Sequence, residues 1–172
     1  MAREWLIDDF ARPQGACGTG TAWRCFTDRV MGGVSEAAAQ HGEVAGRPAL
    51  RLRGQVSLEN NGGFVQLALD LAAGGAAVDA GAYAGLALDL YGDGRSYNLH
   101  LRTDACLRPW QSYRATVATA PAWRSLCLPF SAFAPHRLEA PLDTRRLRRV
   151  GLVAIGEAGP VDVAIGRLAL YA

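Results

Sequence analysis

The strongest constraint on the fold of this chain is an alternation of apolar and polar residues on both sides of Asn61-Gly62. The apolar positions are Leu50, Leu52, Val56 and Leu58 before it and Val65, Leu67, Leu69 and Leu71 after it. A period of two is typical of half-buried strands, and Asn-Gly favours a two-residue turn with both residues at positive φ. We therefore predict a β-hairpin whose register pairs Leu58 with Val65, Val56 with Leu67 and Leu52 with Leu71.

Residues 86–101 repeat this pattern around Asp93-Gly94. The alternation predicts a second hairpin, in which Leu90 pairs with Tyr97, Leu88 with Leu99 and Leu86 with Leu101. Its opposite face then collects the hydrogen-bonding side chains of Asp89, Asn98, His100 and Arg102.

One aromatic residue, Phe64, lies on the polar face of the first predicted hairpin. Either a loop or a second sheet covers Phe64, or Phe64 contacts a ligand. Upstream, an aromatic strand near residues 23–27 leads into Gly32-Gly33, where we predict a sharp corner that displays Asp28, Arg29 and Ser35. The spacing of these glycines does not match a phosphate-binding loop.

The remaining segments also predict short strands. Residues 5–10 suggest an edge strand, residues 113–117 and 123–128 two more, and residues 150–155 a central strand that is covered on both faces. A bulge at Gly166-Arg167 would correct the phase of the last strand. The charge run Arg145, Arg146, Arg148 and Arg149 reads as a solvated sheet edge or as a contact for an anionic partner. Nine or ten short strands, with short helical turns in the loops, predict an all-β antiparallel sandwich.

Composition limits the function. The 172 residues suggest one domain, residues 1–172, and a net charge of +2 gives no indication of nucleic acid as a partner. All eighteen basic residues are Arg, so a catalytic lysine and a phosphate-loop lysine are excluded. No apolar run approaches the roughly twenty residues that span a bilayer, so we expect no integral membrane segment.

The four cysteines (Cys17, Cys25, Cys106 and Cys127) and three histidines lack the spacing of a zinc or redox site. We therefore expect free thiols, no metal and no cofactor. Residues 1–10 carry three acids and one Arg, which is unlike a mitochondrial transit peptide, and no signal peptide is evident. The expected location is cytoplasmic.

Several motifs resemble the complex I intermediate-associated protein 30 (CIA30) family. They are residues 27–35, which include Met31, Gly32, Gly33 and Ser35; residues 57–64, which include Asn61, Gly62 and Gly63; residues 92–97; and residues 128–130 and 150–152. The resemblance implies a jelly-roll β-sandwich similar to galactose-binding domains. It also implies an assembly or chaperone role toward subunits or intermediates of respiratory complex I, with no established catalytic residues.

Three classes of function remain open from the sequence. The first is a non-catalytic domain that binds a protein partner, and the second is a carbohydrate-binding module of jelly-roll type. The third, an enzyme, would need Asp28, Asp89 or Glu59 as an acid or base. The absence of a complete catalytic motif favours the first class.

We predict the binding surface on the polar face of the second hairpin and the adjoining glycine corner. Its residues are Asp28, Arg29, Phe64, Asp89, Asn98, His100 and Arg102. The alternative is that a loop packs over this face and that these groups satisfy one another, with Asp89 accepting from Arg102 or His100.

Overall fold

The computed structural model describes residues 3–12 and 17–172, which form short strands linked by turns and single-turn 3-10 helices. The strands are β1 (Glu4–Asp8), β2 (Arg24–Thr27), β3 (Glu36–Val44), β4 (Arg47–Val56), β5 (Phe64–Asp70), β6 (Gly85–Tyr91), β7 (Ser96–Thr103), β8 (Ser112–Ala118), β9 (Arg124–Pro129), β10 (Ala134–His136), β11 (Leu147–Ile155) and β12 (Gly159–Tyr171). The 3-10 helices are η2 (Asp28–Met31), η3 (Glu59–Asn61), η4 (Ala73–Gly75), η5 (Phe130–Ala132) and η6 (Thr144–Arg146).

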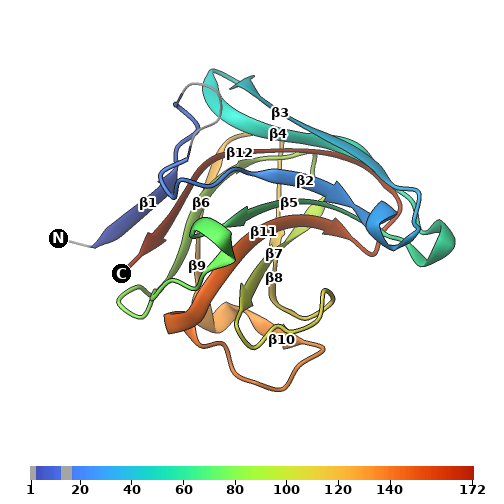
Figure 1. The fold of residues 1–172 in the computed structure, drawn as a ribbon. Helices are drawn as coiled ribbons and strands as arrows, with labels where there is room; N and C mark the ends of the chain where they lie inside the picture. The colour runs from blue at the N-terminus through green and yellow to red at the C-terminus, as the bar shows by residue number, and fades with distance from the viewer. Residues whose placement is uncertain (1–2, 13–16) are drawn as a thin grey trace.

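The strands form two antiparallel sheets of six strands each (Figure 1). Sheet A has the order β3-β4-β12-β6-β9, and β1 also pairs with β12. Sheet B has the order β10-β8-β7-β11-β5-β2. The predicted all-β antiparallel sandwich is therefore confirmed.

The core lies between the inner faces of the two sheets. It is built from the alternating apolar residues that the sequence pattern identified, among them Leu52 and Leu88 of sheet A and Leu67 and Leu99 of sheet B. All four side chains are buried, and burial of one such side chain contributes roughly 1.5–3 kcal/mol. Hydrophobic burial between sheets is therefore the main stabilising contribution.

The first predicted hairpin is wrong in its pairing. β4 pairs with β3 and β12 in sheet A, whereas β5 pairs with β11 and β2 in sheet B. The segment between them is an arch that crosses from one sheet to the other. The predicted turn conformation is only partly right. Positive φ occurs at Asn60 and Asn61, whereas Gly62, predicted to have positive φ, has a φ of −75°.

The second predicted hairpin is wrong for the same reason. β6 lies in sheet A between β12 and β9, and β7 lies in sheet B between β11 and β8. Leu88 is opposite Leu168 and Leu126 instead of Leu99. Alternation determines which side chains point into the core, but a hairpin and an arch bury the same residues.

Three finer predictions are confirmed. β12 has a register shift between Ile165 and Arg167, where the sequence predicted a bulge. β11 is a central strand between β7 and β5, as expected from its apolar residues. All four cysteines are free, Cys17 and Cys106 in buried positions.

Candidate functional site

A groove with a volume of about 490 Å³ lies on the outer face of sheet B. It crosses β8, β7, β11, β5 and β2, so most of its floor consists of strand residues that point away from the core. The lining residues are Phe26, Val30, Met31, Phe64, Gln66, His100, Arg102, Pro109, Trp110, Ser112, Arg114, Arg149, Gly151, Val153 and Ile155.

One row across sheet B contains a glycine at the centre of the groove floor. Gly151 lies between Ala68 of β5 and His100 of β7, and His100 lies opposite Arg114 of β8. A Cβ at Gly151 would lie only 2.7 Å from Nε2 of Gln66. Glycine at this position therefore lets Gln66 lie across the floor.

Exposed apolar side chains form both rims. Val30 and Met31, on η2, are 71% and 63% exposed, and Trp110, in the loop after β7, is 55% exposed. Apolar side chains gathered around one cavity are typical of a binding surface. On the floor, the rings of Phe26 and Phe64 meet edge to face with centroids 6.2 Å apart.

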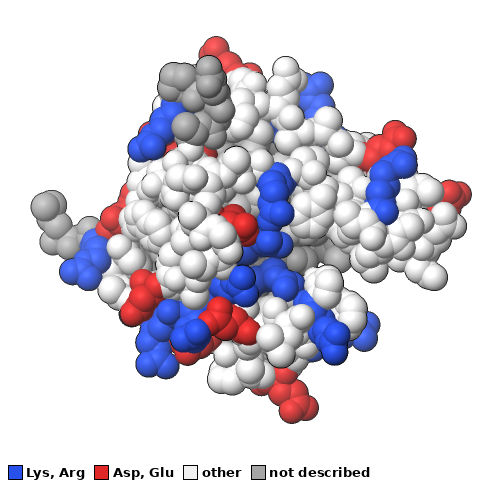
Figure 2. Space-filling view, viewed as in Figure 1, with Lys and Arg blue, Asp and Glu red and all other residues white. Residues whose placement is uncertain are grey.

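The charged groups of the groove are all cationic. Arg102, Arg114 and Arg149 line it, and no Asp or Glu of the described chain is among the lining residues. Figure 2 shows Arg side chains gathered in the middle of the face that carries β11. The arrangement suits an apolar ligand that carries negative charge.

His100 is the most perturbed titratable group in this groove. Only 8% of the residue is exposed, and within the described chain Nε2 has no hydrogen-bond partner. Burial, followed by repulsion from Arg114, His136 and Arg102, lowers the pKa of His100 to about 3. The imidazole is therefore neutral at physiological pH.

Arg102 holds the loop that carries Trp110. Its Nη1 donates to the carbonyl oxygens of Arg108, Pro109 and Gln111 at 2.8–3.2 Å, and its Nη2 donates to Cys106 O at 3.1 Å. The predicted alternative, in which a loop packs against this face, thus holds for Arg102. However, the acceptors are backbone carbonyls and not Asp89.

Asp89 lies apart from the other predicted residues, because β6 belongs to sheet A. It accepts a hydrogen bond of 2.8 Å from Arg47 and one of 2.7 Å from Ser125. Asn98 remains on the outer face of β7, where it accepts from Thr116 at 3.3 Å, but it does not line the groove. Of the four polar residues of the predicted face, only His100 and Arg102 line the groove.

The glycine corner does not display Asp28 or Ser35, because both are fully buried. Asp28 accepts hydrogen bonds from the backbone N–H and the hydroxyl of Ser35, and from the N–H groups of Gly63 and Phe64. Burial acts to raise the pKa of Asp28, but these hydrogen bonds outweigh it and lower the pKa. Asp28 is a structural residue that joins η2 to the start of β3 and to the β4–β5 arch.

The close approach of Asp28 explains why positions 33 and 62 are glycine. A Cβ at Gly33 would lie 2.4 Å from Asp28 Cγ, and one at Gly62 would lie 2.5 Å from Oδ2. Arg29 is exposed and turns from the groove to bind the Ser35 carbonyl and Glu36. Phe64, held through its N–H by Asp28, is the one residue of the predicted border that lines the groove.

Several groove residues were missed by the sequence reasoning. No local pattern marks Val30, Trp110 or Arg114, and the sequence identifies Met31 only as part of a family motif. Arg149 could have been found, because Arg149, Gly151, Val153 and Ile155 share one parity of β11. The charge run that contains Arg149 lies partly in this central strand, so the prediction of a sheet edge is wrong.

The three proposed acid or base residues do not form a catalytic pair. Asp28 is buried and accepts hydrogen bonds from Ser35, Gly63 and Phe64. Asp89 lies in sheet A, whereas the groove lies on sheet B, and Glu59 lies in the arch at η3. Over residues 3–12 and 17–172, no cluster of three or more His, Cys, Asp or Glu side chains has the geometry to hold a metal ion. Among the helices of the described segments, none is long and apolar enough to cross a membrane.

Comparison with protein families identifies the family of this chain. The sequence model of the family described as Complex I intermediate-associated protein 30 (CIA30) matches residues 9–165. No protein with a curated description matches this chain.

Solved structures with a similar fold include carbohydrate-binding modules. The family 11 module of the cellulase Lic26A-Cel5E of Clostridium thermocellum superposes with a TM-score of 0.76 at 10% identity, covering 99% of this chain and 95% of the module. The family 30 module of Cel9D-Cel44B, also of Clostridium thermocellum, has a TM-score of 0.68 at 15% identity, covering 98% of this chain and 96% of the module. These similarities confirm the jelly-roll fold.

Proposed function

This chain belongs to the CIA30 family, and we propose that it is a non-catalytic binding domain whose groove on sheet B holds a segment of a protein partner. The observation that carries this proposal is the pair of apolar rims. Val30 and Met31 on one rim and Trp110 on the other expose large apolar side chains to solvent, which only a bound partner would cover.

The proposed partner is a subunit or assembly intermediate of a respiratory NADH:ubiquinone oxidoreductase, in keeping with the family. A chaperone-like assembly factor needs no catalytic group, and the groove offers apolar surface together with cationic groups. We propose that binding occurs in the cytoplasm, before the partner subunit is incorporated.

The test is co-purification of complex I subunits with the tagged protein from detergent-solubilised cells. Met31→Ser and Trp110→Ser should each reduce the recovery of these subunits severalfold, since central apolar contacts dominate most interfaces. The matched control is Leu107→Ser, which changes an exposed residue of the same loop outside the groove lining. Recovery that is equal for all four proteins, or absence of complex I subunits, would exclude the proposal.

A second candidate function is carbohydrate binding, which the aromatic residues of the groove lining favour. Phe26, Phe64 and Trp110 lie beside the hydrogen-bonding groups of Gln66 and His100, and sugar rings stack on aromatic faces. One solved structure of a family 11 module is a complex with a β-1,3-1,4-mixed-linked tetrasaccharide. Calorimetric titration with that tetrasaccharide separates the two candidates: binding that Trp110→Ser abolishes would support the carbohydrate function.

A further inference from the structure

A second, smaller pocket of about 90 Å³ adjoins the groove and shares Arg102 and Arg149 with it. The other residues that line it are Asp70, Gly75, Thr103 and Arg148. Its volume is several times the ~10–15 Å³ that one water needs, which leaves room for a small polar group. The groove therefore leads from apolar surface into a polar pocket dominated by arginine.

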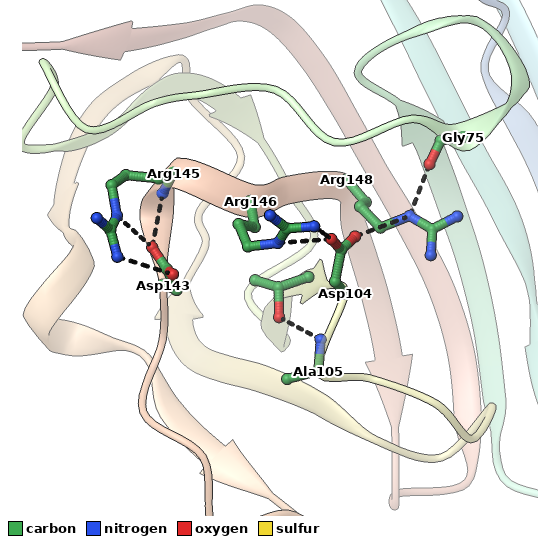
Figure 3. A network of polar contacts seen from close by, with 8 residues as sticks. Gly75, Asp104, Ala105, Asp143, Arg145, Arg146 and Arg148 are labelled. Carbon is green, nitrogen blue, oxygen red and sulfur yellow. Dashed lines mark hydrogen bonds and ion pairs between the residues drawn. The ribbon is translucent and has the colours of Figure 1, made fainter.

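The side chains at this pocket carry excess positive charge. Asp70 lies 2.8 Å from Arg149 and 3.5 Å from Arg24, while Asp104 pairs with Arg146 and lies 3.8 Å from Arg148. Figure 3 shows Asp104 between Arg146 and Arg148, and shows Arg145 turned away toward Asp143. The pocket lining itself thus has three guanidinium groups, of Arg102, Arg148 and Arg149, and one carboxylate, of Asp70. The neighbouring Arg24, Arg146 and Asp104 add two positive charges and one negative charge.

Two of these guanidinium groups keep hydrogen-bonding capacity. Arg148 uses Nε to donate to the Gly75 carbonyl at 2.6 Å, and Arg149 uses Nε to donate to Asp70 at 2.8 Å. Their Nη groups donate no hydrogen bond to any residue of the described chain. Both arginines are thus anchored through one nitrogen and present the rest of the planar fork to the pocket.

The backbone at η4 leaves space for these forks. Gly75 has a φ of +71°, and a Cβ at this position would lie 3.2 Å from an Nη atom of Arg148. Glycine at position 75 therefore allows both the positive φ and the close approach of the Arg148 guanidinium group.

Like charges oppose one another here. Burial first, then repulsion from Arg149 and Arg148, lowers the pKa of Arg102, although its guanidinium remains charged. A bound anion would relieve this repulsion and would satisfy the Nη donors of Arg148 and Arg149.

We propose that the small pocket binds a carboxylate of the partner segment, so that the segment recognised by this domain carries an acidic residue next to apolar ones. This inference rests on the proposed function, because the apolar groove holds the flanking residues. His100 is a second polar residue of the groove floor and precedes Arg102 by two residues in β7. Its buried Nε2 has no hydrogen-bond partner in the described chain.

The test compares two peptides that differ only in charge, acetyl-Phe-Glu-Phe-amide and acetyl-Phe-Gln-Phe-amide. Binding is followed by the NMR shifts of the backbone N–H groups of Gly75 and Arg148 in the pocket and of Gly151 and Val153 in the groove. The Glu peptide should bind about tenfold more tightly than the Gln peptide, because it adds charge-assisted hydrogen bonds. Arg148→Gln and, independently, Arg149→Gln should remove that difference, whereas the control Arg145→Gln, outside both pockets, should preserve it.

The outcomes separate this inference from the proposed function. Equal binding of both peptides in the groove would overturn the carboxylate site and leave the groove proposal standing. Shifts confined to the pocket would support the anion site and contradict the proposed function. Inorganic phosphate at the same ionic strength is the third probe, and tighter binding of phosphate than of the Glu peptide would overturn the assignment to a carboxylate. No shift with either peptide would overturn both proposals.

Discussion

The carboxylate of Asp28 accepts a hydrogen bond of 2.6 Å from the backbone N–H of Gly63, 35 residues further along the chain. The same carboxylate accepts hydrogen bonds from Ser35, which directly precedes β3 of sheet A, and from Phe64, the first residue of β5 in sheet B. One buried charge thus stabilises the ends of both sheets and the arch between them. Phe64 then contributes its ring to the groove floor.

Asp28→Asn should therefore destabilise the domain by about 2 kcal/mol or more, because the new amide N–H₂ would face backbone donors inside the protein. Urea denaturation measures the change. Glu43→Gln removes a carboxylate from an exposed position in β3 and should leave the free energy of unfolding nearly unchanged. Equal stability of the two variants would contradict the role of Asp28.

Gly62→Ala should also destabilise the domain, by about 1–3 kcal/mol. The reason is a steric clash and not the positive φ that the sequence predicts for Gly62. The φ of Gly62 is accessible to any residue, but a Cβ there would lie 2.5 Å from Asp28 Oδ2. Gly42→Ala is the matched control, since a Cβ at Gly42 meets nothing within 4 Å. A melting temperature for Gly62→Ala as high as that of the control would contradict the steric argument.

Arg102→Ala should loosen the loop that carries Trp110, because four backbone carbonyls lose their donor. We expect a loss of about 1–3 kcal/mol in stability. We also expect faster hydrogen exchange of the N–H groups of residues 104–108 and 110–111. Arg108→Ala, in the same loop, should change neither quantity appreciably, and unchanged exchange in the Arg102 variant would rule out the anchoring role.

His100 should make stability depend on pH between about 6.5, the ordinary histidine pKa, and about 3, the pKa in the folded protein. In this window His100 is protonated in the unfolded chain but neutral in the folded protein. Stability is therefore full above pH 6.5 and falls with decreasing pH, by about 1 kcal/mol per pH unit. Replacing the titrating ring, in His100→Gln, should flatten this part of the curve relative to the wild type, whereas His41→Gln, in exposed β3, should not.

Asp28 contributes to acid sensitivity as well, but in a lower pH range. Burial raises the pKa of Asp8, so its change of protonation shifts toward the range of His100. The lowered pKa of Asp28 adds stability that is present above its ordinary value of 3.8 and is lost as pH falls further. The difference between wild type and His100→Gln at pH 4–6 therefore isolates the histidine. A difference between the two proteins that does not change with pH over that interval would contradict the buried, neutral imidazole.

The sequence was most informative where a local pattern has one structural solution. The period of two identified inward-facing residues such as Leu52 and Leu67, both buried, and the phase change in the last strand located the bulge before Arg167. The glycine motifs were identified correctly as constrained backbone. However, the constraint at Gly33 and Gly62 is the proximity of Asp28, which is distant in sequence from Gly62.

The sequence by itself determined that this chain folds into two layers of short antiparallel strands, because the alternation of apolar and polar residues determines which side chains are buried between the layers. Only the tertiary structure decided which strands pair. The N–H groups of Gly63 and Phe64, to which a hairpin assigns no distant partner, bind Asp28, and the arch sends β5 to the opposite sheet. That choice separates Asp89 from His100 and Arg102 and brings Trp110, Met31 and Arg149 to one groove, because contacts between distant segments depend on sheet order and not on local pattern.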